Sequence, residues 1–265
     1  MKTNIFDWNK LSQLSVIQFL LATFIPSAFA FMGFHFIAPR LVTNGIPALY
    51  AWLIVASTML LILVIIAIIL LLREARKLEV PLSTRVCFRK LSIKEWLIYI
   101  LLFIISAVIC LGATKLVVPM INMIGFKIPS YTPFFLNPEI NPATSDLATL
   151  APGVQIIGNY GLVVFVAITI LLNVLAEEFY FRAWMLPKLS KYGAGAWVIN
   201  GFLFAFYHTF QLWMLPVLLI GSLIMAFIFY KSKSIWPTLI GHLVTNFLFS
   251  LLGILLLVMG SIPNT

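Results

Sequence analysis

Long runs of hydrophobic residues, separated by short polar segments, dominate the pattern along the chain. A helix needs about 20 mostly apolar residues to cross a bilayer. By that criterion the pattern predicts seven spans, at 16–38, 46–72, 96–118, 160–181, 194–210, 212–230 and 235–258. The fifth span is short and its junction with the sixth is tight, which indicates a broken or re-entrant arrangement there.

The composition indicates that the bilayer is the solvent of this chain. Of its 265 residues, 62% are hydrophobic and only 9% are charged, and the mean hydropathy is +1.09. A soluble domain has about 25% charged residues. We therefore predict an all-α fold, a polytopic membrane bundle of about seven transmembrane helices around a polar cavity, with residues 1–265 as one domain. The first span follows Lys2 and Lys10, and we interpret it as retained rather than cleaved.

Basic residues mark one side of the predicted membrane protein. The segment 73–95 carries seven Lys and Arg residues, and the positive-inside rule makes it cytoplasmic. Counting spans outward from it places the N-terminus in the cytoplasm and the C-terminus outside. The net charge of +9 therefore reports topology and contact with lipid headgroups, so membrane lipids are expected partners and nucleic acid is not. The short chain suggests a bacterial cell membrane.

The segments outside the spans are predicted to connect or anchor them. Six of the 14 prolines lie in 119–158, which predicts an external loop, with a connector, a re-entrant segment and a cover left open. Segment 80–94 mixes apolar and basic residues and predicts a short amphipathic helix. We interpret His35 as an isolated interfacial residue. The tryptophans near span ends are interpreted as interface anchors, namely Trp184, Trp197, Trp213 and Trp236.

Ionisable side chains inside the predicted spans mark the candidate site. The chain has eight acidic residues and three histidines, yet Glu177, Glu178, His208 and His242 lie in apolar runs, as does Asn246. A charged side chain at the bilayer centre costs about 2.5–3.5 kcal/mol on insertion scales. Such residues are candidates for function, and here they occur as a set.

Helical spacing predicts which of these side chains share a face. Glu178 and Arg182 are four residues apart and can pair. Glu177 is rotated from Glu178 by about 100°, which leaves it free for chemistry. Phe204 lies one turn from His208, where its ring could hold the imidazole.

The same spacing predicts the depth of each group. From the turn at Gly193, Glu177 is 16 residues away (193 − 177) and His208 is 15 (208 − 193), so an antiparallel hairpin places them level. His242 and Asn246 follow the next basic turn and reach a similar depth. We expect all four side chains to meet in one buried cavity.

A glutamate, two histidines and an asparagine suit peptide hydrolysis. A carboxylate or an imidazole in a dry cavity can take a proton from water, and His and Asn can donate hydrogen bonds to an oxyanion. Alternatively, Glu177, His208 and His242 could hold zinc with an activated water. The helical zinc signature H-E-x-x-H is absent and Asn is a poor zinc ligand, so we favour a site without metal or another cofactor.

Three short motifs carry a resemblance to a known family. They are Glu177-Glu178-x-x-x-Arg182, Phe204-x-x-x-His208 and His242-x-x-x-Asn246, in this order on successive predicted helices. The chain thereby resembles the CAAX protease and bacteriocin-processing family (CPBP, also called Abi), which includes the type II prenyl-protein endopeptidases. The resemblance covers about 160–250, which we take as the catalytic core.

The resemblance implies an intramembrane endopeptidase that acts on a membrane-associated peptide or protein, of the CAAX type or of the leader and bacteriocin type. It implies Glu177 and His208 as the pair that activates water, and His242 and Asn246 as the oxyanion site. The substrate is expected to be a peptide or protein that carries a lipid in some members. Two other functions stay open, a non-proteolytic scaffold or immunity factor on the same fold, and a proton-coupled transporter, although no internal repeat supports the latter.

Overall fold

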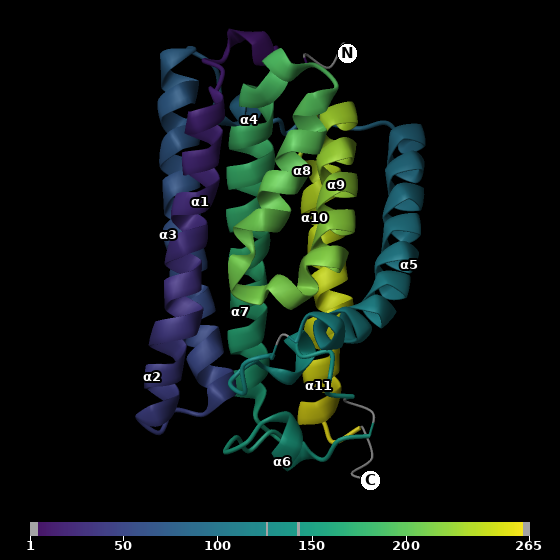
Figure 1. Ribbon diagram of the computed structural model, residues 1–265. Coiled ribbons are helices and arrows are strands. Elements are labelled where there is room, and N and C mark those ends of the chain that lie inside the picture. The colour runs from purple at the N-terminus through teal and green to yellow at the C-terminus, as the bar shows by residue number, and fades with distance from the viewer. Residues whose placement is uncertain (1–4, 126, 142–143, 262–265) are drawn as a thin grey trace.

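The computed structural model describes residues 5–125, 127–141 and 144–261, with the side chain of Phe249 left out. Lys2 and Pro142 therefore lie outside the described residues. None of these described residues forms a strand, and the helices run roughly along one axis as a bundle (Figure 1). The predicted all-α membrane fold is confirmed.

Within the described ranges, five helices are long and apolar enough to cross a membrane by length and composition. They are Val16–Thr43 (α1, Val16–Met32; η2, Gly33–Ile37; α2, Ala38–Thr43), α3 (Ala48–Lys77), α5 (Ile93–Ile124), Tyr160–Tyr192 (α7, Tyr160–Glu177; η4, Glu178–Met185; η5, Leu186–Tyr192) and Thr209–Ser232 (η6, Thr209–Met214; α9, Leu215–Ser232). The remaining short helices are η1 (Trp8–Lys10), α4 (Leu82–Arg85), η3 (Phe134–Leu136) and α6 (Leu147–Leu150).

The other two predicted spans are shorter or divided. α8 (Gly195–Tyr207) has 13 residues, and a non-helical Gln211 interrupts the path from it into α9. The last apolar run forms α10 (Trp236–Asn246), η7 (Phe247–Leu251) and α11 (Leu252–Val258) in succession. The predicted break between the fifth and sixth spans is confirmed, whereas the count of seven transmembrane helices is not.

Local sequence explains where several helices begin and end. Ser15 and Ser92 each accept a backbone hydrogen bond at the start of α1 and α5, and Gln18 and Glu95 reciprocate in capping boxes. The side chain of Asn159 caps α7 by accepting from Leu162 N–H. These polar caps satisfy backbone N–H groups that a helix leaves unpaired.

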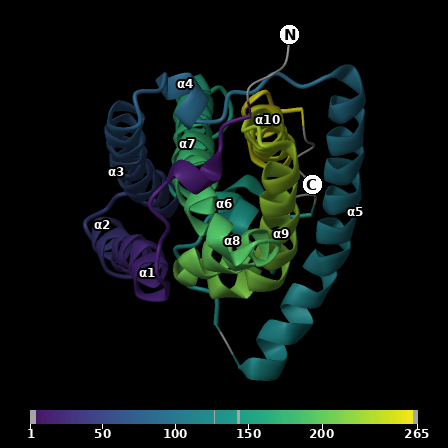
Figure 2. The same ribbon diagram turned by 90° about the horizontal axis from the view of Figure 1, so that it is seen from above.

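The helix that carries the two glutamates lies inside the bundle. α7 packs against α3 and α10, and α8 packs against α1 and α9. α5 packs mainly on α9 and lies at the edge of the bundle when viewed from above (Figure 2). Many of its side chains are exposed, including Leu97, Leu101 and Val108, as expected for a surface that faces lipid.

One close approach joins α8 to α9. A Cβ atom on Gly201 would lie 2.8 Å from Leu223 Cδ2 and 2.9 Å from Leu223 Cα. Ser222 also donates a 2.9 Å hydrogen bond to the Gly201 carbonyl. Small residues allow helix backbones to meet in this way in membranes. This contact fixes the helix that ends at His208.

The proline-rich segment differs in part from the prediction. α5 continues through Pro119 to Ile124, because its neighbours in the bundle and lipid tolerate a proline that a propensity argument rejects. Beyond it, the described residues form a loop with only η3 and α6. Trp213 donates a 2.9 Å hydrogen bond to Leu136 O and holds this loop on the bundle. The loop lies at the end opposite η1 and α4 (Figure 1).

The segment 80–94 is less helical than predicted. Only Leu82–Arg85 forms a helix, of four residues. Arg85 is fully buried rather than directed at headgroups. The end of α11 lies at the opposite end of the bundle from η1 (Figure 1). Which of these ends faces the cytoplasm stays a prediction.

Candidate active site

The two glutamates lie where the helix changes its winding. α7 ends at Glu177, and η4 continues with π-helical hydrogen bonds from Glu178. π-Bulges occur frequently at functional sites. Polar side chains from elsewhere bind carbonyls of this widened segment: Asn200 Nδ2 donates to Phe181 O over 2.9 Å, and Arg85 Nη1 donates to Ala183 O over 2.6 Å. The chain thus holds this winding from both sides.

His208 directs one ring nitrogen at Glu177. It lies just after α8, and its Nδ1 is 2.9 Å from Phe204 O. Because a carbonyl oxygen only accepts, Nδ1 carries a hydrogen and Nε2 of the neutral ring keeps a lone pair. That Nε2 lies 3.4 Å from Glu177 Oε1. The Phe204 ring stands edge-on to the imidazole at 4.9 Å, as the spacing predicted.

His242 lies between the two glutamates. Its Nδ1 is 3.1 Å from Glu178 Oε1 and its Nε2 is 3.8 Å from Glu177 Oε2. An ionised Glu178 makes Nδ1 a donor. The other ring nitrogen, Nε2, faces Glu177. The carboxylate of Glu177 therefore faces the Nε2 atoms of both His208 and His242.

Asn246 reaches Glu177 through a residue that the sequence analysis did not single out. Asn246 Nδ2 donates to Asn173 Oδ1 over 2.9 Å, and Asn173 Nδ2 donates to Glu177 Oε1 over 2.7 Å. Asn173 is a polar residue inside an apolar run, four positions before Glu177. That spacing and its polarity were a signal that could have found it.

Arg182 differs from its predicted role. Glu178 and Arg182 were expected to pair, but they share no hydrogen bond: Glu178 Oε1 contacts His242, and Glu178 Oε2 has no hydrogen-bond partner among the described residues. None of the three guanidinium nitrogens has a hydrogen-bond partner among the described residues. The guanidinium instead lies 4.2 Å from the centroid of the Phe204 ring. Attraction to Glu178 and Glu177 acts at longer range, and a cation–π contact of this desolvated kind contributes about 2 kcal/mol.

The site is almost closed to solvent. Glu177 is 3% exposed, His208 5%, and Glu178 is fully buried. His242 has the more open side chain, at 12%. In such surroundings each charge needs a partner. The two carboxylates here face two imidazoles and one guanidinium.

The donor types would suit zinc, because a carboxylate and two imidazole lone pairs form a known hydrolase ligand set. Their placement does not. Within the described ranges, no three His, Cys, Asp or Glu side chains are grouped as a metal ion would require. We therefore derive the chemistry below from the side chains alone.

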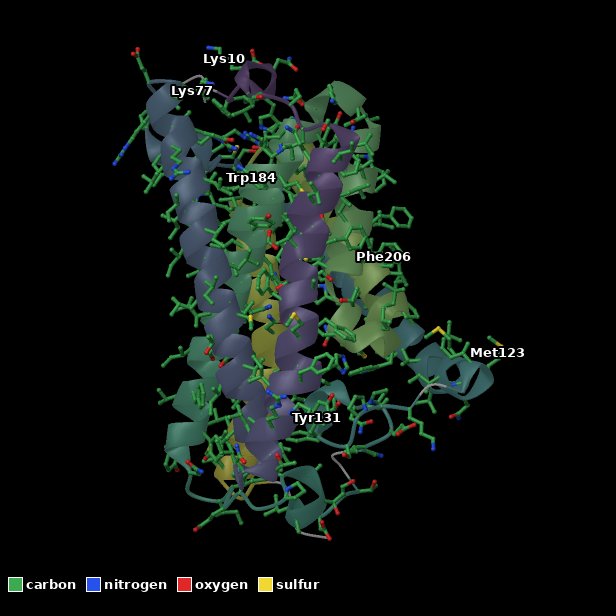
Figure 3. The ribbon with its side chains drawn as sticks, turned by 60° about the vertical axis from the view of Figure 1, so that its left-hand side comes forward. Lys10, Lys77, Met123, Tyr131, Trp184 and Phe206 are labelled. Atoms are coloured by element: carbon green, nitrogen blue, oxygen red, sulfur yellow. The ribbon has the colours of Figure 1, made fainter. Side chains whose placement is uncertain are left out.

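A second buried polar cluster binds η4 and η5, farther along the helix from the two glutamates. Glu74 accepts hydrogen bonds from Arg85, Trp184 and Lys188. The sequence pattern does not reveal this cluster, because its residues come from three separate segments. Figure 3 shows Trp184 toward the end of the bundle that carries Lys10 and Lys77, and Tyr131 toward the other end.

Two interpretations of aromatic and histidine positions were wrong. Trp184 and Trp213 are buried and donate hydrogen bonds inside the protein, so they do not anchor it at an interface. His35 is not isolated: its Nδ1 is 3.0 Å from Tyr131 Oη, and its Nε2 is 3.1 Å from Phe210 O. It joins the loop after α5 to the segment that follows His208.

A known family model matches the part of the chain that contains these side chains. Residues 159–248 match the family model described as type II CAAX prenyl endopeptidase Rce1-like. No curated protein and no solved structure matches the chain. The matched segment contains all three motifs and the polar partners of Glu177 described above, Asn173, His208 and His242. Over this segment, the chain is similar to the CAAX protease and bacteriocin-processing family of intramembrane endopeptidases.

Proposed function

We propose that this protein hydrolyses a peptide bond in a membrane-associated peptide or protein, with Glu177 and His208 activating water and with His242 and Asn246 binding the oxyanion. The observation that carries the proposal is a buried carboxylate, Glu177, that faces the Nε2 atoms of two histidines. General bases in proteases need this reach and this protection from bulk water.

Water activation follows from the hydrogen-bond directions. Nδ1–H of His208 is held by Phe204 O, so its Nε2 accepts one hydrogen of a water molecule. The other hydrogen passes to Glu177 as the water oxygen attacks the carbonyl carbon. When the C–N bond breaks, Glu177 returns this proton to the leaving amine. Atoms and charges balance, and Glu177 ends the cycle ionised.

Oxyanion binding requires donors on the other side of the carbonyl. Nδ1–H of His242 points to Glu178. In its doubly protonated form, which we propose for the reaction, the ring has Nε2–H left for the oxyanion, with Glu178 as its counter-ion. Asn246 has a second amide hydrogen beyond the one given to Asn173. Preorganised donors of this kind contribute about 10²–10³ in kcat each.

The substrate is proposed to approach within or beside the membrane. Glu177 lies in an apolar segment long enough to cross a membrane, and His208 directly follows the apolar helix α8. The matched family is named for prenyl endopeptidases. A peptide with an attached lipid, or a leader peptide with an apolar segment, meets both conditions. We propose that the basic segment 73–95 lies on the cytoplasmic side, as its charge predicts, and that the membrane is bacterial.

The test is cleavage by the purified full-length chain in detergent. Fluorogenic peptides with and without a prenyl group are offered to the wild type, Glu177→Gln, His208→Ala and Asn246→Ala. Glu139→Gln serves as the matched control, because Glu139 is an exposed glutamate outside the site. We expect losses of about 10²–10⁴ for Glu177→Gln and His208→Ala, and none for Glu139→Gln.

The outcomes decide separately on the metal, on the base and on the enzymatic role. Activity that survives a strong chelator supports a reaction carried by the side chains, whereas loss that zinc restores would assign the metal to Glu177, His208 and His242. Full activity in Glu177→Gln would refute the proposed base. Absence of cleavage with every peptide would favour a scaffold or immunity role on this fold.

A further inference from the structure

Asn173 connects two parts of the site that come from different helices. It lies on α7, one turn before Glu177, and on the same face. Its side chain contacts Glu177 on one side and Asn246 on the other, over 2.7 and 2.9 Å. Asn246 ends α10, 73 residues along the chain. No other described hydrogen bond joins the proposed base to this asparagine.

The two hydrogen bonds that link Asn246, Asn173 and Glu177 have only one consistent direction. An ionised carboxylate accepts and cannot donate, so Asn173 must turn its NH₂ group toward Glu177. Its carbonyl oxygen must then face Asn246, which has to present its own NH₂ group. The assignment of both amides thus follows from the charge on Glu177, without observed hydrogens.

From this geometry we propose that Asn173 is a positioning residue, which orients Glu177 and turns the NH₂ group of Asn246 toward the oxyanion. The inference rests on the proposed function and deepens it. One hydrogen of Asn246 is committed to Asn173, so the amide cannot flip without losing that bond. The second hydrogen is left pointing into the site.

Asn173 also distinguishes the two oxygens of the base. Oε1 of Glu177 accepts the Asn173 hydrogen bond, whereas Oε2 faces His242. Oε1 therefore has one lone pair engaged by Asn173 when Glu177 takes a proton from water. Asn173 acts through Glu177 and Asn246 and does not itself touch the reacting atoms.

Asn173 would make the same contacts if its role were only structural, since polar side chains often join membrane helices. Thr169 offers a matched control. It lies one turn earlier on α7, and its Oγ1 is 2.8 Å from Ser57 Oγ on α3. Thr169→Val removes a hydrogen bond between helices of the same kind, but leaves the site untouched.

The first measurement compares kcat and KM for Asn173→Leu and Thr169→Val. Loss of an orienting partner lowers activity on the order of 10- to 100-fold. We expect Asn173→Leu to lower kcat by this factor with KM within about twofold, because Asn173 orients groups that act in the chemical step and does not bind the substrate. Thr169→Val should keep both parameters. Wild-type kcat in Asn173→Leu, or equal losses in the two variants, would overturn the proposal.

The second measurement is the pH profile of Asn173→Asp. The new carboxyl group can donate to Glu177 only when it is protonated, so activity should fall as pH rises through its titration. His208, His242, Glu178 and Arg182 face the site in both proteins, so the difference between the profiles isolates position 173. A profile that parallels the wild type would contradict the assigned direction.

The third measurement needs no substrate. The infrared carboxylate band of Glu177, assigned by its loss in Glu177→Gln, should shift in Asn173→Leu and stay in place in Thr169→Val. An unshifted band refutes the link to Asn173 even if no peptide is cleaved. A shifted band in a protein that cleaves nothing keeps the link and rejects the proposed function, so the two failures are distinguishable.

Discussion

Arg85 connects the segment after α3 to the widened helix that carries the candidate site. Its side chain is fully buried and donates to Glu74 through Nε and Nη2, to Ala183 O over 2.6 Å and to Trp184 O over 3.4 Å. Breaking a buried ion pair costs about 3–5 kcal/mol, and a buried acceptor left without a donor costs about 1–3 kcal/mol.

For Arg85→Met we expect a loss of about 2–4 kcal/mol, less than for a fully buried pair that loses its only partner. The reason is that Glu74 keeps Lys188 and Trp184 as donors and is 19% exposed. Arg89 provides the control. It also pairs with a glutamate, but its side chain and that of Glu95 are 12% and 33% exposed. An exposed pair contributes at most about 1 kcal/mol.

The assay is thermal unfolding in detergent, followed by intrinsic tryptophan fluorescence. For a chain of this size about 2–4 °C corresponds to 1 kcal/mol, so Arg85→Met should lower Tm by roughly 5–10 °C, and Arg89→Met by less than half of that. Equal shifts in the two variants would refute the reasoning that burial decides the cost. A normal Tm in Arg85→Met would show that the Ala183 carbonyl needs no donor.

Two further predictions concern helix packing and a buried thiol. Gly201→Ala should destabilise the protein by about 1–3 kcal/mol through overpacking against Leu223. Gly221→Ala should not, because its Cβ would meet only Cys110 Sγ, at 3.8 Å. Similar Tm values for the two variants would contradict the close-packing argument. Burial raises the pKa of the Cys87 thiol, so alkylation of a Cys110→Ser protein should stay slow at pH 8 and accelerate only above the usual titration range of a thiol. Rapid labelling of the folded protein at pH 8 would count against this burial.

Much of the site could be predicted because bilayers penalise unpaired polar groups. Glu177, His208 and His242 were conspicuous in apolar runs, and helix periodicity placed them at similar depth. Their distances of 3.4 and 3.8 Å agree with that expectation. Their catalytic role stays a prediction. Asn173 carried the same signal, but no motif drew attention to it.

Other contacts could not be predicted from spacing. A regular α-helix was assumed from Glu178 to Arg182, whereas the structure has π-helical winding there. Whether a helix widens depends on donors from other segments, here Asn200 and Arg85. The partner of Glu178 likewise depends on the position of His242, which is 64 residues away.

The sequence by itself determined that the bilayer is the solvent of the protein, that the fold is helical, and which ionisable residues lie inside apolar runs. These properties follow from local hydrophobicity and from the cost of burying charge. The tertiary structure decided which imidazole faces which carboxylate and where Asn173 directs its amide. It also decided that Arg85 pairs with a glutamate, whereas Arg182 lies over the Phe204 ring. These choices depend on distances between helices that are far apart in the chain, and no local pattern encodes such distances.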